Sequence, residues 1–228
     1  MRINEIFHSI QGEGKLAGVP SVFVRTTGCN LRCTWCDSPA TSWEPVGEEM
    51  SVDGILDRLA DYACTHVVLT GGEPLLADGV EELTRRIREG GYHLTIETAA
   101  TVWKDVVCDL ASISPKLSNS TPWDREGGRR AEAHERQRIN LDTITRLIAQ
   151  SDYQLKFVVD SPADLLEIDA LVGRLATIET SSVLLMPQGV SEPELAQRGR
   201  WVAELCKQRG YRFCPRLHIV LFGHTRGT

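Results

Sequence analysis

The chain has 228 residues and a formal charge of −6, with 42% hydrophobic and 25% charged residues. This balance is typical of a soluble protein that buries a sizeable core, and it argues against disorder. A net negative charge disfavours a protein that coats nucleic acid, because phosphate binding depends on clustered Lys and Arg. The N-terminal residues lack a signal-peptide pattern, and no stretch approaches the ~20 apolar residues of a membrane span. We therefore expect a cytoplasmic protein with neither a nucleic-acid nor a membrane partner.

Strand and helix patterns alternate along the chain and predict one domain over residues 1–228. Runs typical of strands cover 3–10, 22–26, 66–70, 93–97, 110–114, 153–159, 182–186 and 211–214. Helical periodicity covers 52–63, 80–88, 141–149, 162–175 and 194–209, with a short amphipathic piece at 102–107. The polar segment 119–137 is expected to be an irregular loop or a solvated helix without a catalytic role. This order predicts βα units and a mainly parallel sheet.

Three cysteines after the second predicted strand have the spacing C-x3-C-x2-C: Cys29, Cys33 and Cys36. Thiolates are the ligands of iron–sulfur clusters, and one short loop can bring three of them to one cluster. A four-iron cube would keep one iron without a protein ligand, and that iron could bind an outside molecule. A structural zinc site would need a nearby fourth Cys or His, which the sequence lacks. The other cysteines are expected to be buried apolar side chains: Cys64, Cys108, Cys206 and Cys214.

Polar residues also follow the predicted parallel strands. Five of them stand at or just beyond strand ends: Thr70, Glu97, Ser114, Lys116 and Gln188. The carboxyl ends of the strands form the face on which α/β barrels build their sites, so these side chains are expected to share one pocket. Taken singly, each of these residues could instead cap a helix or lie in a turn.

Several motifs resemble those of known families. The cysteine spacing, with Trp35 before the last cysteine, is similar to that of the radical S-adenosylmethionine (SAM) superfamily, and the Thr-Gly-Gly-Glu-Pro stretch 70–74 resembles its SAM-binding turn. The stretches 10–14, 36–38, 114–116, 217–218 and 226–228 resemble the 7-carboxy-7-deazaguanine synthase family of the queuosine pathway. This resemblance implies an α/β fold of radical SAM type, an incomplete TIM-like (β/α) barrel with about six mainly parallel strands.

The resemblance also implies a reaction and its cofactors. A [4Fe-4S] cluster on the three cysteines would cleave SAM to a 5′-deoxyadenosyl radical, which abstracts hydrogen from C6 of 6-carboxy-5,6,7,8-tetrahydropterin. Ring contraction with loss of ammonia would then give 7-carboxy-7-deazaguanine. Mg²⁺ would bind at Ser38 together with substrate oxygens, although one hydroxyl cannot hold this ion alone. A flavodoxin as electron donor and a homodimer are further expectations from the likeness.

Individual positions match the family's ligand-contacting residues. Those for SAM are Trp35, Asp37, Gly72, Ser114, Pro115, Lys116 and Gln188, and Glu97 touches either SAM or substrate. Those for the substrate are Ile10, Gln11, Gly12, Glu13, Arg25, Thr70 and Thr228, the last through the terminal carboxylate. From the residues alone, the loop at 11–14 could be a plain surface turn, and Arg25 could pair with an acid instead of clamping a substrate carboxylate.

Two other functions stay open on sequence grounds. A radical SAM activase that generates a glycyl radical on a partner protein shares the cysteine loop and the Gly-Gly-Glu-Pro turn, but it does not need the loop at 11–14. A zinc-binding interaction module would be non-enzymatic, and metal analysis would distinguish it from an iron–sulfur enzyme.

Overall fold

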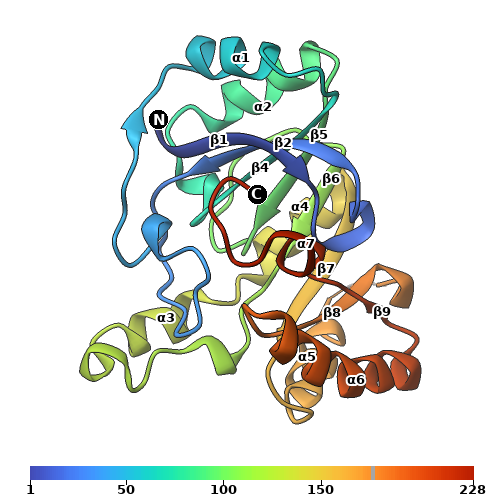
Figure 1. Cartoon of the computed structure of the whole chain (residues 1–228). Coiled ribbons are helices and arrows are strands. Elements are labelled where there is room, and N and C mark those ends of the chain that lie inside the picture. The colour runs from blue at the N-terminus through green and yellow to red at the C-terminus, as the bar shows by residue number, and fades with distance from the viewer. Residues whose placement is uncertain (176–177) are drawn as a thin grey trace.

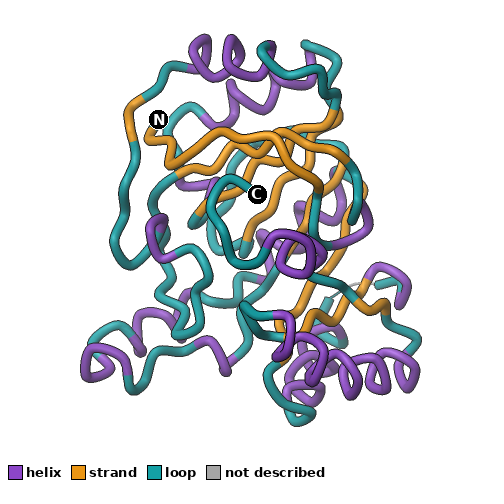
Figure 2. The backbone as a smooth tube through the Cα atoms, in the orientation of Figure 1, coloured by secondary structure: helices purple, strands orange, loops and turns teal. Residues whose placement is uncertain are grey.

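The computed structural model describes residues 1–175 and 178–228, and within them one sheet of nine strands forms the centre. The spatial order is β3-β1-β2-β4-β5-β6-β7-β8-β9. The strands are β1 (Arg2–Ile10), β2 (Pro20–Thr26), β3 (Glu48–Glu49), β4 (His66–Gly71), β5 (His93–Thr98), β6 (Leu110–Ile113), β7 (Asp152–Val159), β8 (Val183–Pro187) and β9 (Arg212–Phe213). Figure 1 shows the sheet curving around the C-terminal segment, and Figure 2 sets its strands (orange) apart from the surrounding helices (purple).

The sheet is parallel from β2 through β9, whereas β1 pairs antiparallel with both β2 and β3. This confirms the predicted partial barrel with a mainly parallel sheet. The six longer parallel strands, β2 and β4 to β8, match the expected number. β3 had no predicted counterpart, and its two glutamates pair with the start of β1.

Seven α-helices lie in the described residues: α1 (Val52–Ala60), α2 (Val80–Glu89), α3 (Ala131–Gln137), α4 (Leu141–Gln150), α5 (Asp164–Val172), α6 (Glu192–Arg209) and α7 (Leu217–Phe222). Ser51 begins α1 by accepting a hydrogen bond from the Gly54 N–H, as its N-cap preference predicts. Gly210 ends α6 at φ +69°, a conformation that glycine adopts without strain. None of the described helices combines the length and apolar character needed to cross a bilayer.

Two sequence expectations differ from the observed elements. The amphipathic piece at 102–107 is an irregular connection between β5 and β6, and only Val106 is buried in the core. The helix expected at 162–175 is shorter, because residues 161–163 form a turn before α5. Segment 119–137 contains α3, which fits the expected solvated helix, whereas α7 had no predicted counterpart.

The core lies between the outer face of the sheet and the helices. Alternate residues of each strand enter it, for example Leu69 of β4, Ile96 of β5 and Phe157 of β7, all fully buried. They pack with apolar residues of the helices, such as Leu83 of α2 and Ile144 of α4. Because side chains alternate along a strand, the intervening residues point to the concave face, where the site lies.

Candidate active site

A cavity of about 460 Å³ occupies the concave face of the sheet and its carboxyl-end loops. It is lined by nearly all the residues that the sequence indicated: Ile10, Gln11, Gly12, Glu13, Arg25, Cys29, Cys33, Trp35, Cys36, Asp37, Ser38, Thr70, Gly72, Glu97, Ser114, Lys116 and Thr228. Pro115 and Gln188 are not among the lining residues. Pro115 is buried after β6, and the Gln188 side chain is held by Arg198.

Strand register places polar side chains in one row across the concave face. Arg25 of β2 is paired with Thr70 of β4, and Glu97 of β5 with Ser112 of β6. Ser112 is paired in turn with Gln154 of β7 and accepts a hydrogen bond from its Nε2 at 2.7 Å. The row arises because each of these residues faces inward and directly neighbours a residue of its strand that enters the core on the opposite face.

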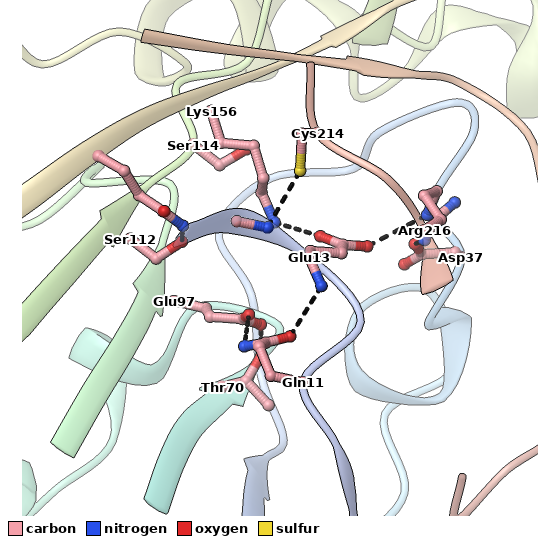
Figure 3. Close-up of polar contacts among 12 residues, drawn as sticks. Gln11, Glu13, Asp37, Thr70, Glu97, Ser112, Ser114, Lys156, Cys214 and Arg216 are labelled. Carbon is pink, nitrogen blue, oxygen red and sulfur yellow. Dashed lines mark hydrogen bonds and ion pairs between the residues drawn. The ribbon is translucent and has the colours of Figure 1, made fainter. Parts of the chain in front are cut away.

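Glu97 lies at the centre of this row and is held from two directions. Gln11 Nε2 donates to Glu97 Oε1 at 3.0 Å, and Thr70 Oγ1 donates to Glu97 Oε2 at 2.9 Å. The Gln11 side chain also accepts from the Glu13 N–H at 3.1 Å, which fixes the turn of the loop. Figure 3 shows Gln11, Thr70 and Glu97 converging. Glu97 is therefore hydrogen-bonded directly to two residues that are expected to bind the substrate.

Four charged side chains of alternating sign continue from β7 to the cysteine loop (Figure 3). Lys156 Nζ binds Glu13 Oε2, and Arg216 Nε binds Glu13 Oε1 at 3.1 Å. Arg216 Nη2 then binds Asp37 Oδ2. Burial alone would raise the pKa of the Glu13 carboxyl, but Lys156 and Arg216 hold this pKa far below its usual range. Arg216 likewise lowers the pKa of Asp37 against the effect of burial, so both carboxylates stay ionised.

The loop of Cys29, Cys33 and Cys36 is buried against Leu31 and Ala99. Burial raises the pKa of the Cys29 thiol to about 11 and that of Cys33 to about 12. The described charges of the protein therefore do not make these thiols ionise, and a bound cation is what would favour the thiolates. Among the described residues, no three His, Cys, Asp or Glu side chains converge as they would on a single metal ion.

The turn after β4 supports the cysteine loop through very close backbone contacts. A Cβ atom on Gly72 would lie 2.4 Å from the Gly28 carbonyl oxygen and 2.8 Å from Cys29 Cβ, so only glycine fits. Glu73 points away from the cavity and is 1% exposed. Its carboxylate accepts from the Leu75 N–H, Thr98 Oγ1 and the Ala99 N–H. The glutamate of the Gly-Gly-Glu-Pro turn thus ties the end of β5 to the turn.

Arg25 reaches the cavity from β2 and is already paired with an acid. Its Nε donates to Glu5 Oε1 at 2.8 Å, and its Nη1 lies 3.5 Å from Ser38 Oγ. Arg226 of the C-terminal segment approaches Glu5 Oε2 at 3.5 Å. A guanidinium has five N–H donors in a planar fork, so Arg25 keeps donors for a further carboxylate.

The polar segment 119–137 packs behind the cysteine loop. Its buried His134 accepts a hydrogen bond from the Arg32 N–H at Nδ1, at 3.1 Å. The other ring nitrogen lies 2.8 Å from Ser120 Oγ, and the Ser120 carbonyl accepts from the Thr34 N–H at 2.8 Å. This segment, which was expected to have no catalytic role, therefore supports the cysteine loop structurally.

Several cavity residues had no predicted site role, among them Lys156, Arg216 and His218, the last of which appeared only within the family-like stretch 217–218. Lys156 stands inside a predicted strand, where the alternation of side chains could have placed it on the concave face. His218 covers the loop at 11–13, because a Cβ atom on Gly12 would lie 1.9 Å from His218 Nδ1. Arg216 and His218 follow β9, where no sequence pattern indicated that the chain returns to the N-terminal loop.

Comparison with known proteins identifies the family. The model of the radical SAM superfamily matches residues 23–117. The chain is 50% identical to the 7-carboxy-7-deazaguanine synthase of Halobacterium salinarum, over 96% of this chain and 90% of that protein. It is 46% identical to the enzyme of the same name from Rhodopirellula baltica, over 99% and 88%. The chain belongs to the 7-carboxy-7-deazaguanine synthase family.

A solved structure agrees with this membership. The crystal structure of QueE from Escherichia coli has a TM-score of 0.70 and 25% identity, and the match covers 93% of this chain and 92% of that chain. The family match extends through the C-terminal part that carries Arg216 and His218. A glycyl-radical activase and a zinc module, the alternatives that sequence motifs left open, do not account for likeness over the whole length.

The cysteine loop fits the cofactors of a radical SAM family. Two of its thiols have nearby polar groups: the Leu31 N–H lies 3.4 Å from Cys29 Sγ, and Ser42 Oγ lies 3.2 Å from Cys36 Sγ. A cubane cluster binds each thiolate on a different iron, so its ligands need not converge on one point. Cys29, Cys33 and Cys36 would each provide a thiolate ligand to a [4Fe-4S] cluster, and the adjoining cavity would give SAM access to it.

Proposed function

We propose that this chain converts 6-carboxy-5,6,7,8-tetrahydropterin to 7-carboxy-7-deazaguanine and ammonia. One observation carries the proposal: a single cavity joins the cysteine loop to a substrate-sized set of polar groups on the concave face. The conversion is redox-neutral overall, because the product differs from the substrate by one ammonia. Membership of the synthase family supports this choice of substrate and product.

The polar groups of the cavity complement a carboxylated pterin. Glu13 and Glu97 are acceptors for the N–H groups of the pyrimidine ring, and the Gln11 amide offers a donor and an acceptor on the same loop. Arg25, at the other side of the cavity, suits the carboxylate on C6. The stacked rings of Phe7 and Phe23, 4.9 Å apart, add an apolar wall. These residues would orient C6 toward the cysteine loop.

The bound cofactors would supply one-electron cleavage of SAM and hence hydrogen abstraction. This chain's residues would hold them: the three cysteines ligate the cluster, and Trp35, Asp37, Gly72, Ser114 and Lys116 line the SAM side. Lys116 Nζ is fixed by the Ser114 carbonyl and hydroxyl, both at 2.8 Å, and so presents a positive charge at the cavity wall. A cation there suits the carboxylate of the methionine moiety.

The surroundings of Ser38 make a Mg²⁺ site there dependent on the substrate. Ser38 Oγ has Asp37 Oδ1 at 3.3 Å but also the Arg25 guanidinium at 3.5 Å, a cation that opposes metal binding. A Mg²⁺ ion at Ser38 therefore needs the substrate carboxylate and water to complete its shell. Isothermal titration with MgCl₂ should show binding only after the pterin is added.

Three further expectations belong to this proposal. The chain forms one radical SAM domain, an expectation that the single sheet of the described residues supports. A flavodoxin is the expected electron donor, and a homodimer the expected assembly, both from likeness to the family. Sedimentation analysis of the reconstituted protein and reduction with purified flavodoxin test them separately.

Anaerobic turnover tests the proposal. The protein is reconstituted with iron and sulfide, reduced with dithionite, and mixed with SAM and the carboxylated tetrahydropterin. Mass spectrometry should detect 7-carboxy-7-deazaguanine, lighter than the substrate by one ammonia. Full cluster loading with SAM cleavage but no deazapurine would refute the proposed substrate.

A further inference from the structure

Arg216 connects three parts of the cavity that come from distant parts of the sequence. Its guanidinium binds Glu13 of the N-terminal loop, Asp37 of the cysteine loop, and the Gly189 carbonyl after β8 at 2.6 Å. The side chain is only 6% exposed, so these three partners hold a nearly buried guanidinium. Figure 3 shows it lying between the two carboxylates.

The backbone next to Arg216 is attached to the same N-terminal loop. The Leu217 N–H donates to the Gly12 carbonyl at 2.8 Å, and the His218 ring packs over Gly12. A shift of the loop at 11–13 must therefore move the start of α7 and with it the guanidinium. Glu13 and Asp37 cannot change position independently while one planar fork holds both.

Glu13 and Asp37 lie in different parts of the cavity, one proposed to bind pterin and the other SAM. Glu13 lies with Gln11 and Lys156 among the groups that would hold the pterin, whereas Asp37 directly follows Cys36 on the SAM side. A pterin N–H that donates to Glu13 would weaken the pairing between this carboxylate and the Arg216 guanidinium. The guanidinium could then pair more closely with Asp37. Tighter pairing with Asp37 would hold the loop after Cys36 in one conformation before SAM arrives.

We propose that Arg216 is a positioning residue that makes the binding of pterin and the binding of SAM mutually dependent. The inference rests on the proposed function, because it assumes pterin on the Glu13 side and SAM on the Asp37 side. Linkage requires the effect to be reciprocal: if pterin tightens SAM binding by a given factor, SAM tightens pterin binding by the same factor.

Equilibrium binding measures this coupling without turnover. Anaerobic titration calorimetry on the protein with its oxidised cluster, which cannot cleave SAM, gives the Kd of SAM with and without saturating pterin. The wild-type protein is expected to bind SAM at least about fivefold more tightly with pterin present, the lower end of typical couplings. Arg216→Lys keeps the charge but cannot reach both carboxylates. In this variant the ratio of the SAM Kd without pterin to the SAM Kd with pterin should fall below about twofold.

Arg209→Lys is the matched control, because Arg209 binds Asp169 through two nitrogens far from the cavity lining. Its ratio should equal that of the wild type. If Arg216→Lys loses its iron or its fold, Asp37→Asn tests the same link by removing the carboxylate charge. A wild-type ratio near one, or a ratio unchanged in Arg216→Lys and Asp37→Asn, would overturn the inference. Cooperative binding without deazapurine formation would instead refute the proposed function alone.

Discussion

The buried His134 should make the stability of the protein sensitive to mild acid. Burial, together with the cations Arg138 and Lys116, lowers the pKa of this imidazole from 6.5 to about 4, against the opposing effect of Glu135. Between these two values the unfolded chain binds more protons than the folded one, so the free energy of unfolding falls as the pH falls. The stabilisation is complete above pH ~6.5 and is lost toward pH ~4.

The size of the effect follows from the two pKa values. Protonation of the unfolded chain costs the folded state about 1.3 kcal/mol between pH 7.5 and pH 5.5, and about 3 kcal/mol once the pH reaches 4. Because His134 accepts from the Arg32 N–H, the loss should be felt first in the cysteine loop. Typical domains have only about 5–15 kcal/mol of stability, so this is a measurable fraction.

Urea unfolding of the iron-free protein at pH 7.5, 6.5 and 5.5, followed by tryptophan fluorescence, is the assay. His134→Gln keeps an acceptor and a donor but does not titrate, so its stability should fall by about 1.3 kcal/mol less between pH 7.5 and 5.5. His8→Gln, at an exposed position of β1, is the control and should follow the wild type. Equal acid sensitivity of the wild type and His134→Gln would refute the reasoning.

Three other substitutions test the site. Cys33→Ala should give a folded protein that binds less iron and forms no 5′-deoxyadenosine, measured by iron assay and chromatography; retained SAM cleavage would contradict the cluster assignment. Arg25→Ala should lower kcat/KM for the pterin by roughly 10- to 150-fold, the worth of a charged hydrogen bond of about 1.5–3 kcal/mol, while SAM cleavage without substrate persists; equal loss of both would remove Arg25 from the substrate role. Gly72→Ala should destabilise the protein by about 1–3 kcal/mol, because its Cβ would meet the Gly28 carbonyl, and its melting temperature should fall by about 2–4 °C per kcal/mol. Gly54→Ala in α1, where a Cβ would lie 3.3 Å from Ser51 Oγ and 4.0 Å from Met50 Cε, should lower the melting temperature less than Gly72→Ala does, because it meets side-chain atoms and not a backbone carbonyl.

Local patterns predicted the parallel strands, the cysteine loop and several polar residues of the cavity, whereas the family resemblance indicated others, such as Gln11 and Asp37. The strand runs were short and rich in β-branched residues, and their polar ends lie together because parallel strands share one carboxyl edge. The cysteine spacing and the Gly-Gly-Glu-Pro turn indicated two loops that the structure brings into contact at Gly72 and Gly28. Membership of the family confirms the expected fold and the radical SAM chemistry.

The residues that were missed depend on alternation and on long-range contacts. Lys156 lies within a strand, where attention to strand ends alone overlooks an inward side chain. Arg216 meets Glu13 about 200 positions earlier in the chain, a contact that no local period encodes. Likewise, His134 stands in a polar segment whose composition indicates solvent, although the ring is buried against Ser120 and the Arg32 N–H.

The most direct test of the proposed reaction measures whether the hydrogen on C6 of the pterin is transferred to 5′-deoxyadenosine. The reduced, reconstituted protein is supplied with SAM and with the carboxylated tetrahydropterin that carries deuterium at C6, and both products are weighed by mass spectrometry. If the cavity aims C6 at the cysteine loop, 5′-deoxyadenosine gains one deuterium as 7-carboxy-7-deazaguanine accumulates. Deazapurine formation with unlabelled 5′-deoxyadenosine would contradict the account.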